Sequence, residues 1–184
     1  LTEAAEIQAV ALEKGKVISP VTTAQFSRTT RIKRLTLEKS PSVKYPGWGE
    51  LGLVDGRQGG TDYHESDWIG FEGESLDATI DLGEQKSISS IRLSCLEDQN
   101  SWIFLPSSIK LLTSTDGATF VQTAEWKGET RPAGTAAARE TALIIMPKSC
   151  RYLRILASNV GTCPSWHKGA GGKAWLFIDE IIIN

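Results

Sequence analysis

The sequence predicts an all-β protein and, among all-β folds, an eight-stranded jelly-roll β-sandwich. Several short segments alternate apolar and polar residues, as in residues 76–82 (LDATIDL), which is typical of a strand with one buried and one solvated face. Turns rich in Gly, Pro, Asp and Ser separate these segments, and no stretch shows a convincing amphipathic helical period. The loops between the strands are long and rich in polar and aromatic residues, which favours a jelly roll over other sandwiches.

Residues 1–34 are expected to lie outside this sandwich. Residues 4–12 suggest a turn or two of helix, and residues 16–26 (KVISPVTTAQF) suggest a strand broken at Pro20. So few apolar clusters do not make a core, and we expect a linker joined to the trailing edge of a preceding β domain. A solvated connector explains the basic residues better than a nucleic-acid contact does. These residues are Arg28, Arg31, Lys33 and Arg34.

The sandwich itself is expected to span residues 35–184. The expected strands cover residues 35–37, 76–82, 91–95, 109–114, 120–126, 140–146, 151–157 and 175–183. Asp116-Gly117 is typical of a hairpin turn between the fourth and fifth of them. The sixth and seventh strands are expected to form a pair around Pro147.

Residues 51–71 (LGLVDGRQGGTDYHESDWIGF) are expected to form a long ordered loop. A segment this rich in Gly and Asp should be neither helix nor strand. Trp68 and Phe71 at its end need a core to enter, which argues against disorder. Long ordered loops in compact domains are usually functional.

Composition and charge exclude several classes of partner. The formal net charge is −2 and the isoelectric point is about 5.8, so there is no basic surface for nucleic acid or for an anionic membrane. The longest apolar runs, such as residues 142–146, are far shorter than the ~20 residues that cross a bilayer. We therefore expect no nucleic-acid partner and no membrane insertion. The chain begins at Leu1 rather than at a methionine, and we expect it to be a piece of a larger protein.

Nothing in the sequence forms a catalytic motif. Cys95, Cys150 and Cys163 lack metal-binding spacing and are interpreted as buried free thiols, with a disulfide or a reactive thiol as alternatives. The two histidines, His64 and His167, lie in separate loops. We interpret them as hydrogen-bonding groups, although their pairing in one enzyme site is an alternative.

A calcium site is one interpretation of the first half of the loop. Asp55 and the turn at residues 58–61 offer oxygen ligands on a tight glycine loop, which suits a hard cation. Glu180 would add a carboxylate from the last strand. An ordinary Asp-Gly turn with a solvated Glu180 explains the same residues equally well.

The tryptophans suggest a different kind of site. Trp68 and Trp175 lie at strand edges and are expected in the core, whereas Trp126 suits either environment. Trp48, Trp102 and Trp166 lie in polar loops, where an indole can stack on a sugar ring while its neighbours bind hydroxyl groups. The alternative is that these side chains cap the sandwich, and Ile103-Phe104 makes this a serious alternative for Trp102.

Several segments together resemble a discoidin-type domain, also called a coagulation factor 5/8 type C domain. They are VDGRQGGTDY, WIGFEG, LDATIDLG, IRLSCLEDQNSWIFLPSSIKLLTSTDG, YLRILASN and WLFIDEIIIN. Within this group the chain is most similar to the family 32 carbohydrate-binding modules. The segment CPSWHKGAGGKAWLFIDEI resembles the variant at the C-terminus of bacterial chitobiase-like β-hexosaminidases, especially those of gut Bacteroidetes. The resemblance covers residues 35–184, and the preceding segment resembles the last strands of the small β domain that often precedes this module.

The resemblance implies a galactose-binding-domain-like jelly roll that holds a structural calcium and binds galactose or N-acetylhexosamine sugars. The implied calcium ligands are Asp55, Gln58, Thr61, Asp179 and Glu180. The implied sugar-binding residues are His64, Asp98, Gln99, Trp102, Trp166 and His167. An arginine common in the family after the fourth strand has no clear counterpart, because residues 96–98 read LED.

We therefore expect a non-catalytic carbohydrate-binding module of a larger bacterial glycoside hydrolase, a chitobiase or β-N-acetylhexosaminidase. Its partners would be a glycan and the catalytic domain of the same polypeptide, in the periplasm, on the outer surface or outside the cell. The alternative is a structural docking domain that packs on the catalytic domain without binding glycan. A free-standing enzyme would need a nucleophile or an acid–base pair that the sequence does not reveal.

Overall fold

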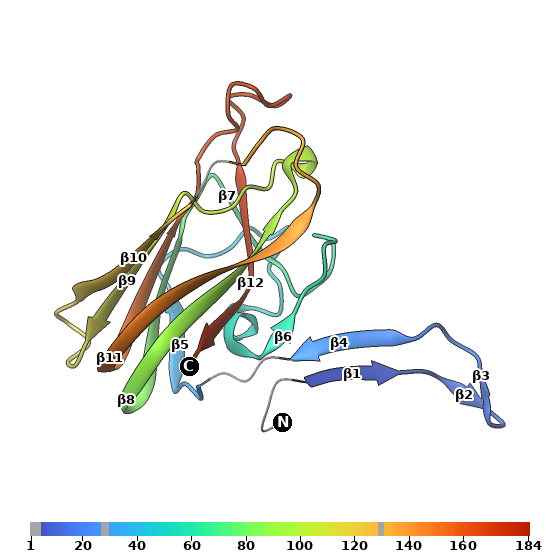
Figure 1. Cartoon of the computed structure of the whole chain (residues 1–184), viewed down its shortest axis with the longest axis horizontal. Helices are drawn as coiled ribbons and strands as arrows, with labels where there is room; N and C mark the ends of the chain where they lie inside the picture. The colour runs from blue at the N-terminus through green and yellow to red at the C-terminus, as the bar shows by residue number, and fades with distance from the viewer. Residues whose placement is uncertain (1–4, 27–29, 129–130) are drawn as a thin grey trace.

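The computed structural model describes residues 5–26, 30–128 and 131–184. Most of these residues form a jelly-roll β-sandwich, as predicted (Figure 1). Two long antiparallel strands, β8 (Leu76–Glu97) and β11 (Ala138–Ser158), pair from Leu76↔Ala157 to Glu97↔Ala138 and run through both layers. The helices among the described residues are short 3₁₀ turns, and none can cross a bilayer.

The halves of these two strands have different neighbours, which defines the two layers. In the first layer, β5 (Arg34–Leu37) pairs with the start of β8, and β9 (Ser108–Ser114) pairs with the end of β11 and with β10 (Val121–Lys127). In the second layer, β12 (Trp175–Ile183) pairs with the end of β8 and with β7 (Ile69–Glu72). The open edges of the layers on one side are therefore β10 and the first half of β11.

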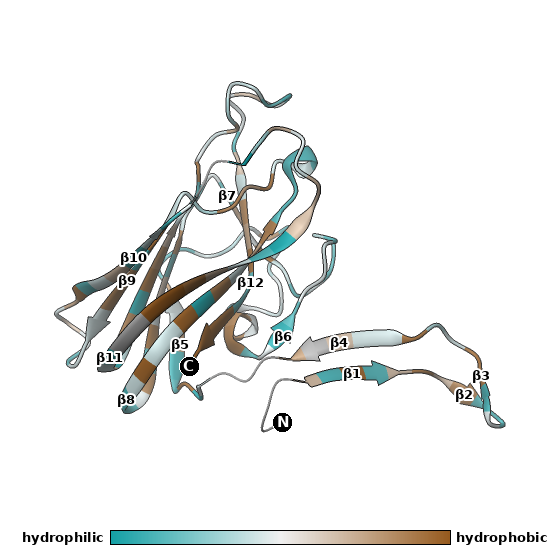
Figure 2. Cartoon of the chain, viewed as in Figure 1, coloured by the Kyte–Doolittle hydropathy of each residue, from teal (hydrophilic) through white to brown (hydrophobic). Residues whose placement is uncertain are grey.

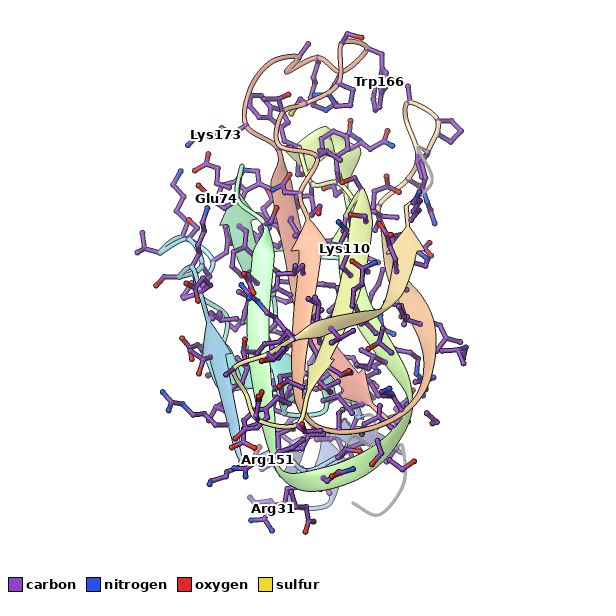
Figure 3. The ribbon with its side chains drawn as sticks, turned by 90° about the vertical axis from the view of Figure 1, so that its left-hand side faces the viewer. Arg31, Glu74, Lys110, Arg151, Trp166 and Lys173 are labelled. Carbon is purple, nitrogen blue, oxygen red and sulfur yellow. The ribbon has the colours of Figure 1, made fainter. Side chains whose placement is uncertain are left out.

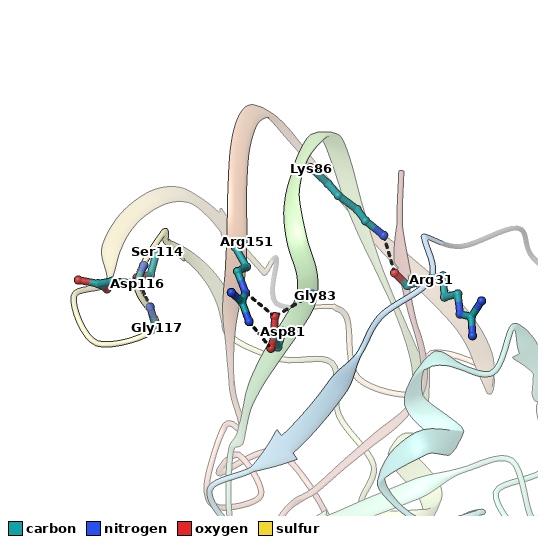
Figure 4. Close-up of polar contacts among 8 residues, drawn as sticks. All are labelled: Arg31, Asp81, Gly83, Lys86, Ser114, Asp116, Gly117 and Arg151. Carbon is teal, nitrogen blue, oxygen red and sulfur yellow. Dashed lines mark hydrogen bonds and ion pairs between the residues drawn. The ribbon is translucent and has the colours of Figure 1, made fainter.

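A polar cluster supports the bend between the two halves of β8 (Figure 4). Gly83 adopts a φ of 83°, which favours glycine, and its N–H donates to Asp81 Oδ1 at 2.7 Å. Arg151 of β11 donates to both oxygens of Asp81, from Nε at 3.0 Å and from Nη2 at 3.2 Å. This guanidinium lowers the pKa of Asp81, and the ion pair joins the two strands where both change layer.

The core lies between the layers and follows the predicted alternation. Residues 76, 78, 80 and 82 of β8 are buried and the residues between them are partly exposed. Apolar residues are concentrated on β8, β11 and β12 (Figure 2). β12 is buried along almost its whole length because the loop of residues 45–68 packs near its outer face. This arrangement places Asp179 and Glu180 inside the protein.

Three local predictions were wrong. Residues 140–146 and 151–157 do not pair with each other, because both belong to the continuous strand β11, just as β8 unites residues 76–82 and 91–95. Residues 4–12 are not helical in their described part, since β1 (Ala5–Ala9) pairs with β4 (Thr22–Phe26). The loop of residues 51–71 contains the 3₁₀ helix η1 (Glu50–Val54) and the short strand β6 (Arg57–Gln58).

The N-terminal segment is a hairpin that reaches away from the sandwich (Figure 1). Its tip, β2 (Leu12–Glu13) and β3 (Lys16–Val17), turns at Lys14-Gly15, where both φ angles are positive. β4 also pairs with β6, so the hairpin continues into the loop of residues 51–71. Arg34 begins β5 and so belongs to the sandwich rather than to a connector, whereas Arg28 lies outside the described residues.

Candidate functional site

The predicted sugar-binding residues lie in loops at one end of the sandwich. Trp166 and Lys173 mark this end, and Arg31 and Arg151 lie at the opposite end (Figure 3). The loops concerned are residues 59–68, 98–107 and 159–174. The end of β8 leads into the second loop through the 3₁₀ turn η2 (Gln99–Ser101), and the third loop leads into β12.

Two of the predicted residues, Gln99 and His167, form the buried centre of this end. His167 is 7% exposed, and its Nδ1 accepts a hydrogen bond from the Gly169 N–H at 3.0 Å. Its Nε2 therefore carries the proton and donates to the Gln99 carbonyl at 2.6 Å. Gln99 is 3% exposed, and its side chain donates to the Pro132 carbonyl and accepts from the Gly134 N–H. Both residues therefore hold loops together from behind the surface.

The exposed tryptophans lie on either side of this centre. The Trp102 ring is 6.1 Å from the His167 ring and the Trp166 ring is 5.8 Å from it. Trp166 also contacts Phe104, edge to face at 6.2 Å. The predicted set is thus divided between two surfaces, one beside Trp102 and one beside Trp166.

The surface beside Trp102 is an aromatic cleft of about 310 Å³, here called the Trp102 cleft. It is lined by Tyr45, Tyr63, Asn100, Ser101, Trp102, Ile103, Trp175 and Phe177. Tyr45 meets the rings of Tyr63 at 5.9 Å and of Trp175 at 5.3 Å, both edge to face, so the aromatic walls are mutually supported. Asn100 and Ser101 add polar groups at the same opening. Aromatic faces with a few polar groups are what a sugar ring requires.

His64 and Asp98 lie beside this cleft. The His64 ring stacks 4.0 Å from Tyr63, and its Nδ1 is 2.7 Å from Asp62 Oδ1. His64 is exposed and lies next to Tyr63, which forms a wall of the cleft. Asp98 accepts a hydrogen bond from Ser101 Oγ at 2.5 Å and so shapes the turn that carries Trp102.

Trp102 has an unusual backbone conformation. Its φ is 67°, a left-handed value that is uncommon for any residue except glycine. A Cβ added at Gly169 would lie 2.6 Å from the indole, and one at Gly172 would lie 2.7 Å from it. The two glycines therefore let the indole lie flat on the third loop, while 36% of the residue stays exposed. Trp102 packs on the protein in part, as the capping alternative supposed, and presents the rest to solvent.

Tyr45 and Tyr63 were not among the predicted residues, although the same criterion selects them. Both lie in loops whose neighbours are polar, Gly or Pro, as Trp102 does. Trp48, which met that criterion, is held differently, because its Nε1–H donates to Asp67 and Arg57 lies over its ring. Trp68 is buried, as predicted for a core residue.

The three cysteines are free and buried, which confirms their interpretation as structural thiols.

The residues expected to bind calcium lie at the other end of the loop of residues 51–71. Glu180 Oε2 accepts from the Gly56 N–H at 2.9 Å, and Asp179 Oδ2 accepts from the Gly59 N–H at 2.7 Å. The carboxylate of Glu180 thus meets the glycine loop, and the side chain of Asp179 does so as well, where the resemblance implied its backbone carbonyl. Gln58 Oε1 instead accepts from Arg139 Nη1 at 2.6 Å, and Thr61 is exposed farther along the loop.

This region fits a cation in part. Within the described residues, Glu180 Oε1 and Asp179 Oδ1 are buried and lack a hydrogen-bond partner. Burial raises the pKa of Asp179 to about 6 and, with the charge of Asp55 nearby, raises that of Glu180 to about 9. Bound calcium would supply the missing positive charge. No group of three or more acidic, His or Cys side chains converges in the described part of the chain, so loop carbonyls would have to complete the coordination.

Comparisons with known proteins give structural matches only. No family model and no curated protein sequence matches the chain. The module of AlyQ in complex with 4,5-unsaturated mannuronic acid, a family 32 carbohydrate-binding module (CBM32), has a TM-score of 0.52 and 16% identity, covering 85% of this chain and 98% of that one. CBM32-3 from a family 31 glycoside hydrolase of Clostridium perfringens has a TM-score of 0.52 and 19% identity, covering 81% and 89%.

A third structure is similar to the same degree. Chitosan-binding module 1, from the chitosanase/glucanase of Paenibacillus sp. IK-5, has a TM-score of 0.52 and 11% identity, covering 84% of this chain and 96% of that one. The chain has the jelly-roll fold of a CBM32 module. At such low identities the comparison establishes the fold alone.

Proposed function

We propose that this chain is a non-catalytic carbohydrate-binding module whose Trp102 cleft binds a galactose- or N-acetylhexosamine-type sugar. The observation that carries the proposal is the Trp102 cleft itself, where five aromatic side chains, one aliphatic and two polar ones surround a space of about 310 Å³. Trp102 and Tyr63 supply faces for stacking, and His64, Asn100 and Ser101 supply groups for hydroxyls. One shallow site of this kind gives a weak affinity, with a Kd of roughly 10–1,000 μM.

The structural neighbours support the class of ligand. One of them, CBM32-2 of a GH31 protein, is bound to GalNAc, with a TM-score of 0.50 and 15% identity. The module of AlyQ is bound to an unsaturated uronic acid, so the fold accepts chemically different sugars. The choice of galactose or N-acetylhexosamine for this chain therefore rests on the family resemblance in its sequence.

The proposal includes a wider setting. We place the module in a larger bacterial glycoside hydrolase of the chitobiase or β-N-acetylhexosaminidase type, in the periplasm, on the outer surface or outside the cell. The sequence of residues 163–181 supports this setting. Calcium held by Asp55, Glu180 and loop carbonyls, with Asp179, Gln58 and Thr61 nearby, would fix the loop of residues 51–71 to β12.

A glycan array followed by calorimetric titration with the highest-scoring sugar tests the binding function. Trp102→Ala should weaken binding by tenfold or more, because it removes the stacking surface. Trp48→Ala, which alters an exposed tryptophan outside the cleft, serves as the matched control and should bind normally. Absence of binding to every glycan, or equal binding by both variants, would contradict the proposal.

The N-terminal hairpin favours a second candidate function, docking on a neighbouring domain. It exposes several large aliphatic side chains that a solvated surface does not need. They are Ile7, Val10, Leu12, Val17, Ile18 and Val21. If docking is the sole function, the chain will bind no glycan, and a variant with Leu12 and Val17 changed to serine will lose association with the catalytic domain.

A further inference from the structure

A second groove lies on the open side of the sandwich, away from the Trp102 cleft. Two adjoining cavities, of about 290 Å³ and about 140 Å³, share Leu105, Pro106 and Arg131 in their walls. The larger is bounded by Trp126 of the edge strand β10, and the smaller by Trp166 of the third loop. We call this continuous surface the lateral groove. The buried pair Gln99 and His167 separates Trp166, at its end, from Trp102.

The smaller cavity of the lateral groove is lined by a carboxylate, that of Glu97, whose hydrogen bonding is incomplete. Glu97 is 3% exposed, and its Oε1 accepts from Gln99 Nε2 at 3.2 Å. Its Oε2 has no hydrogen-bond partner among the described residues, and the nearest cation, Arg131 Nε, is 3.4 Å away. Burial raises the pKa of Glu97, because the ionised carboxylate loses its contact with water. A buried oxygen of this kind gains most from a ligand that donates a hydrogen bond.

The charges around Glu97 define the ligand further. Arg131 also pairs with Glu140, from Nη2 to Oε1 at 2.7 Å, and Lys127 lies in the same wall. Two carboxylates therefore face two cations, and the groove has no excess charge with which to attract an ion. It offers one strong acceptor beside one strong donor, which suits two adjacent hydroxyl groups. Trp126 is half-buried and Trp166 is 43% exposed, so each presents an apolar face at its end of the groove.

We propose that the lateral groove is a second glycan site, which binds a neutral oligosaccharide with one ring near Trp126 and another near Trp166. Hydroxyls of the sugar between them donate to Glu97 Oε2 and accept from Arg131. The proposal rests on the proposed function for the class of ligand, but it involves a different surface and different residues. The module would then bind two sugar segments at once, which raises its avidity for a polymeric glycan.

The indole N–H signals in a ¹H–¹⁵N NMR titration test this directly, because the chain has six tryptophans and each gives one signal. The probes are N-acetylgalactosamine and the β-1,4-linked tetramer of N-acetylglucosamine, and the signals are assigned with single Trp→Phe variants. The tetramer should shift the Trp126 and Trp166 signals in the wild type and equally in Trp102→Ala. The Trp48 signal is an internal control and should not move.

Glu97→Gln keeps the shape of the side chain and removes its charge. It should weaken tetramer binding at Trp166 by about tenfold or more, and leave N-acetylgalactosamine binding at Trp102 unchanged. A melting curve for each variant establishes that it is folded, and Trp166→Phe provides a second, surface variant that keeps the core intact. Movement of the Trp102 signal alone would overturn the second site and leave the proposed function standing. No movement at any tryptophan would overturn both.

Discussion

Trp102 has a backbone conformation that a protein rarely keeps in a non-glycine residue unless the surroundings enforce it. Here the bond from its N–H to the Gln99 carbonyl and the two glycines under its ring fix the conformation. Its indole is therefore positioned before any ligand arrives. Such preorganisation lowers the cost of binding, because little side-chain freedom remains to be lost.

We expect Gly169→Ala to disturb this position. The new Cβ would lie 2.6 Å from the indole, so the ring must move away from the third loop. Sugar affinity should fall severalfold and the free energy of unfolding should drop by about 1–3 kcal/mol, as is usual for overpacking. Calorimetric titration and urea denaturation measure the two effects. Lys168→Ala, an exposed neighbour, is the control, and equal behaviour of the two variants would show that the Gly169 contact is unimportant.

At the residue scale, sequence reasoning identified types of side chain better than their surroundings. The structure places Trp102 and His64, two of the selected residues, in loops near one surface, and the signal that selected them was local, a ring-bearing side chain in a polar loop. The burial of Gln99 and His167 depends on where three loops meet, which a linear sequence does not display. Likewise Arg131 reaches Glu97 from a segment that carries no strand pattern of its own.

The element that most defines the architecture is the bent pair of β8 and β11. Strand-like alternation located both halves of each strand, so most of their core residues were predictable from period alone. The continuity of each strand through its bend was not predictable. Gly83 and Pro147 are as typical of a turn that ends a strand as of a bend within one. The helix expected at residues 4–12 failed because pairing with β4 outweighs weak local propensity.

The ion pair at this bend should make stability depend on pH. Arg151 lowers the pKa of Asp81 in the folded state below its unfolded value of about 3.9. The stabilisation that the ionised Asp81 gives to the folded state is therefore fully present above that value. It is lost as the pH falls through the folded-state pKa of Asp81. We expect the wild type to exceed Asp81→Asn in melting temperature at pH 7 and to lose this advantage on acidification below about pH 4. A constant difference from pH 7 to pH 2 would contradict this assignment.

At the scale of the whole molecule, the loop of residues 51–71 connects three parts of the protein. It pairs with the N-terminal hairpin through β6, meets β12 through Asp179 and Glu180, and supplies Tyr63 to the Trp102 cleft, with His64 beside it. The sequence indicated a functional loop here, and the structure shows how each part of it serves a different neighbour. Its link to the hairpin was not predictable, since β6 has only two residues.

Calcium should stabilise the protein as a whole if this loop binds it. A ligand that binds only the folded state contributes about 2.7 kcal/mol at 100 times its Kd, so the melting temperature should rise by several degrees over an EDTA-treated sample. Glu180→Gln should abolish that rise while remaining folded, because it removes one of the two buried carboxyl groups that have an oxygen without a hydrogen-bond partner. Magnesium is the control cation. An unchanged melting temperature of the wild type in calcium would exclude a structural metal at this loop.

The position of β12 also affects how the chain can fold. This strand lies between β8 and β7, so the second layer stays open, and β7 lacks its ladder partner, until residues 175–183 have left the ribosome. The ladder of β8 and β11 likewise joins residues up to about 80 positions apart, as in Leu76↔Ala157. Folding of the sandwich must therefore wait until residues 175–183 have been synthesised and proceed slowly, with apolar strand edges exposed in the meantime. A nascent chain interrupted before Trp175 would be a substrate for chaperones and proteases rather than a smaller version of this module.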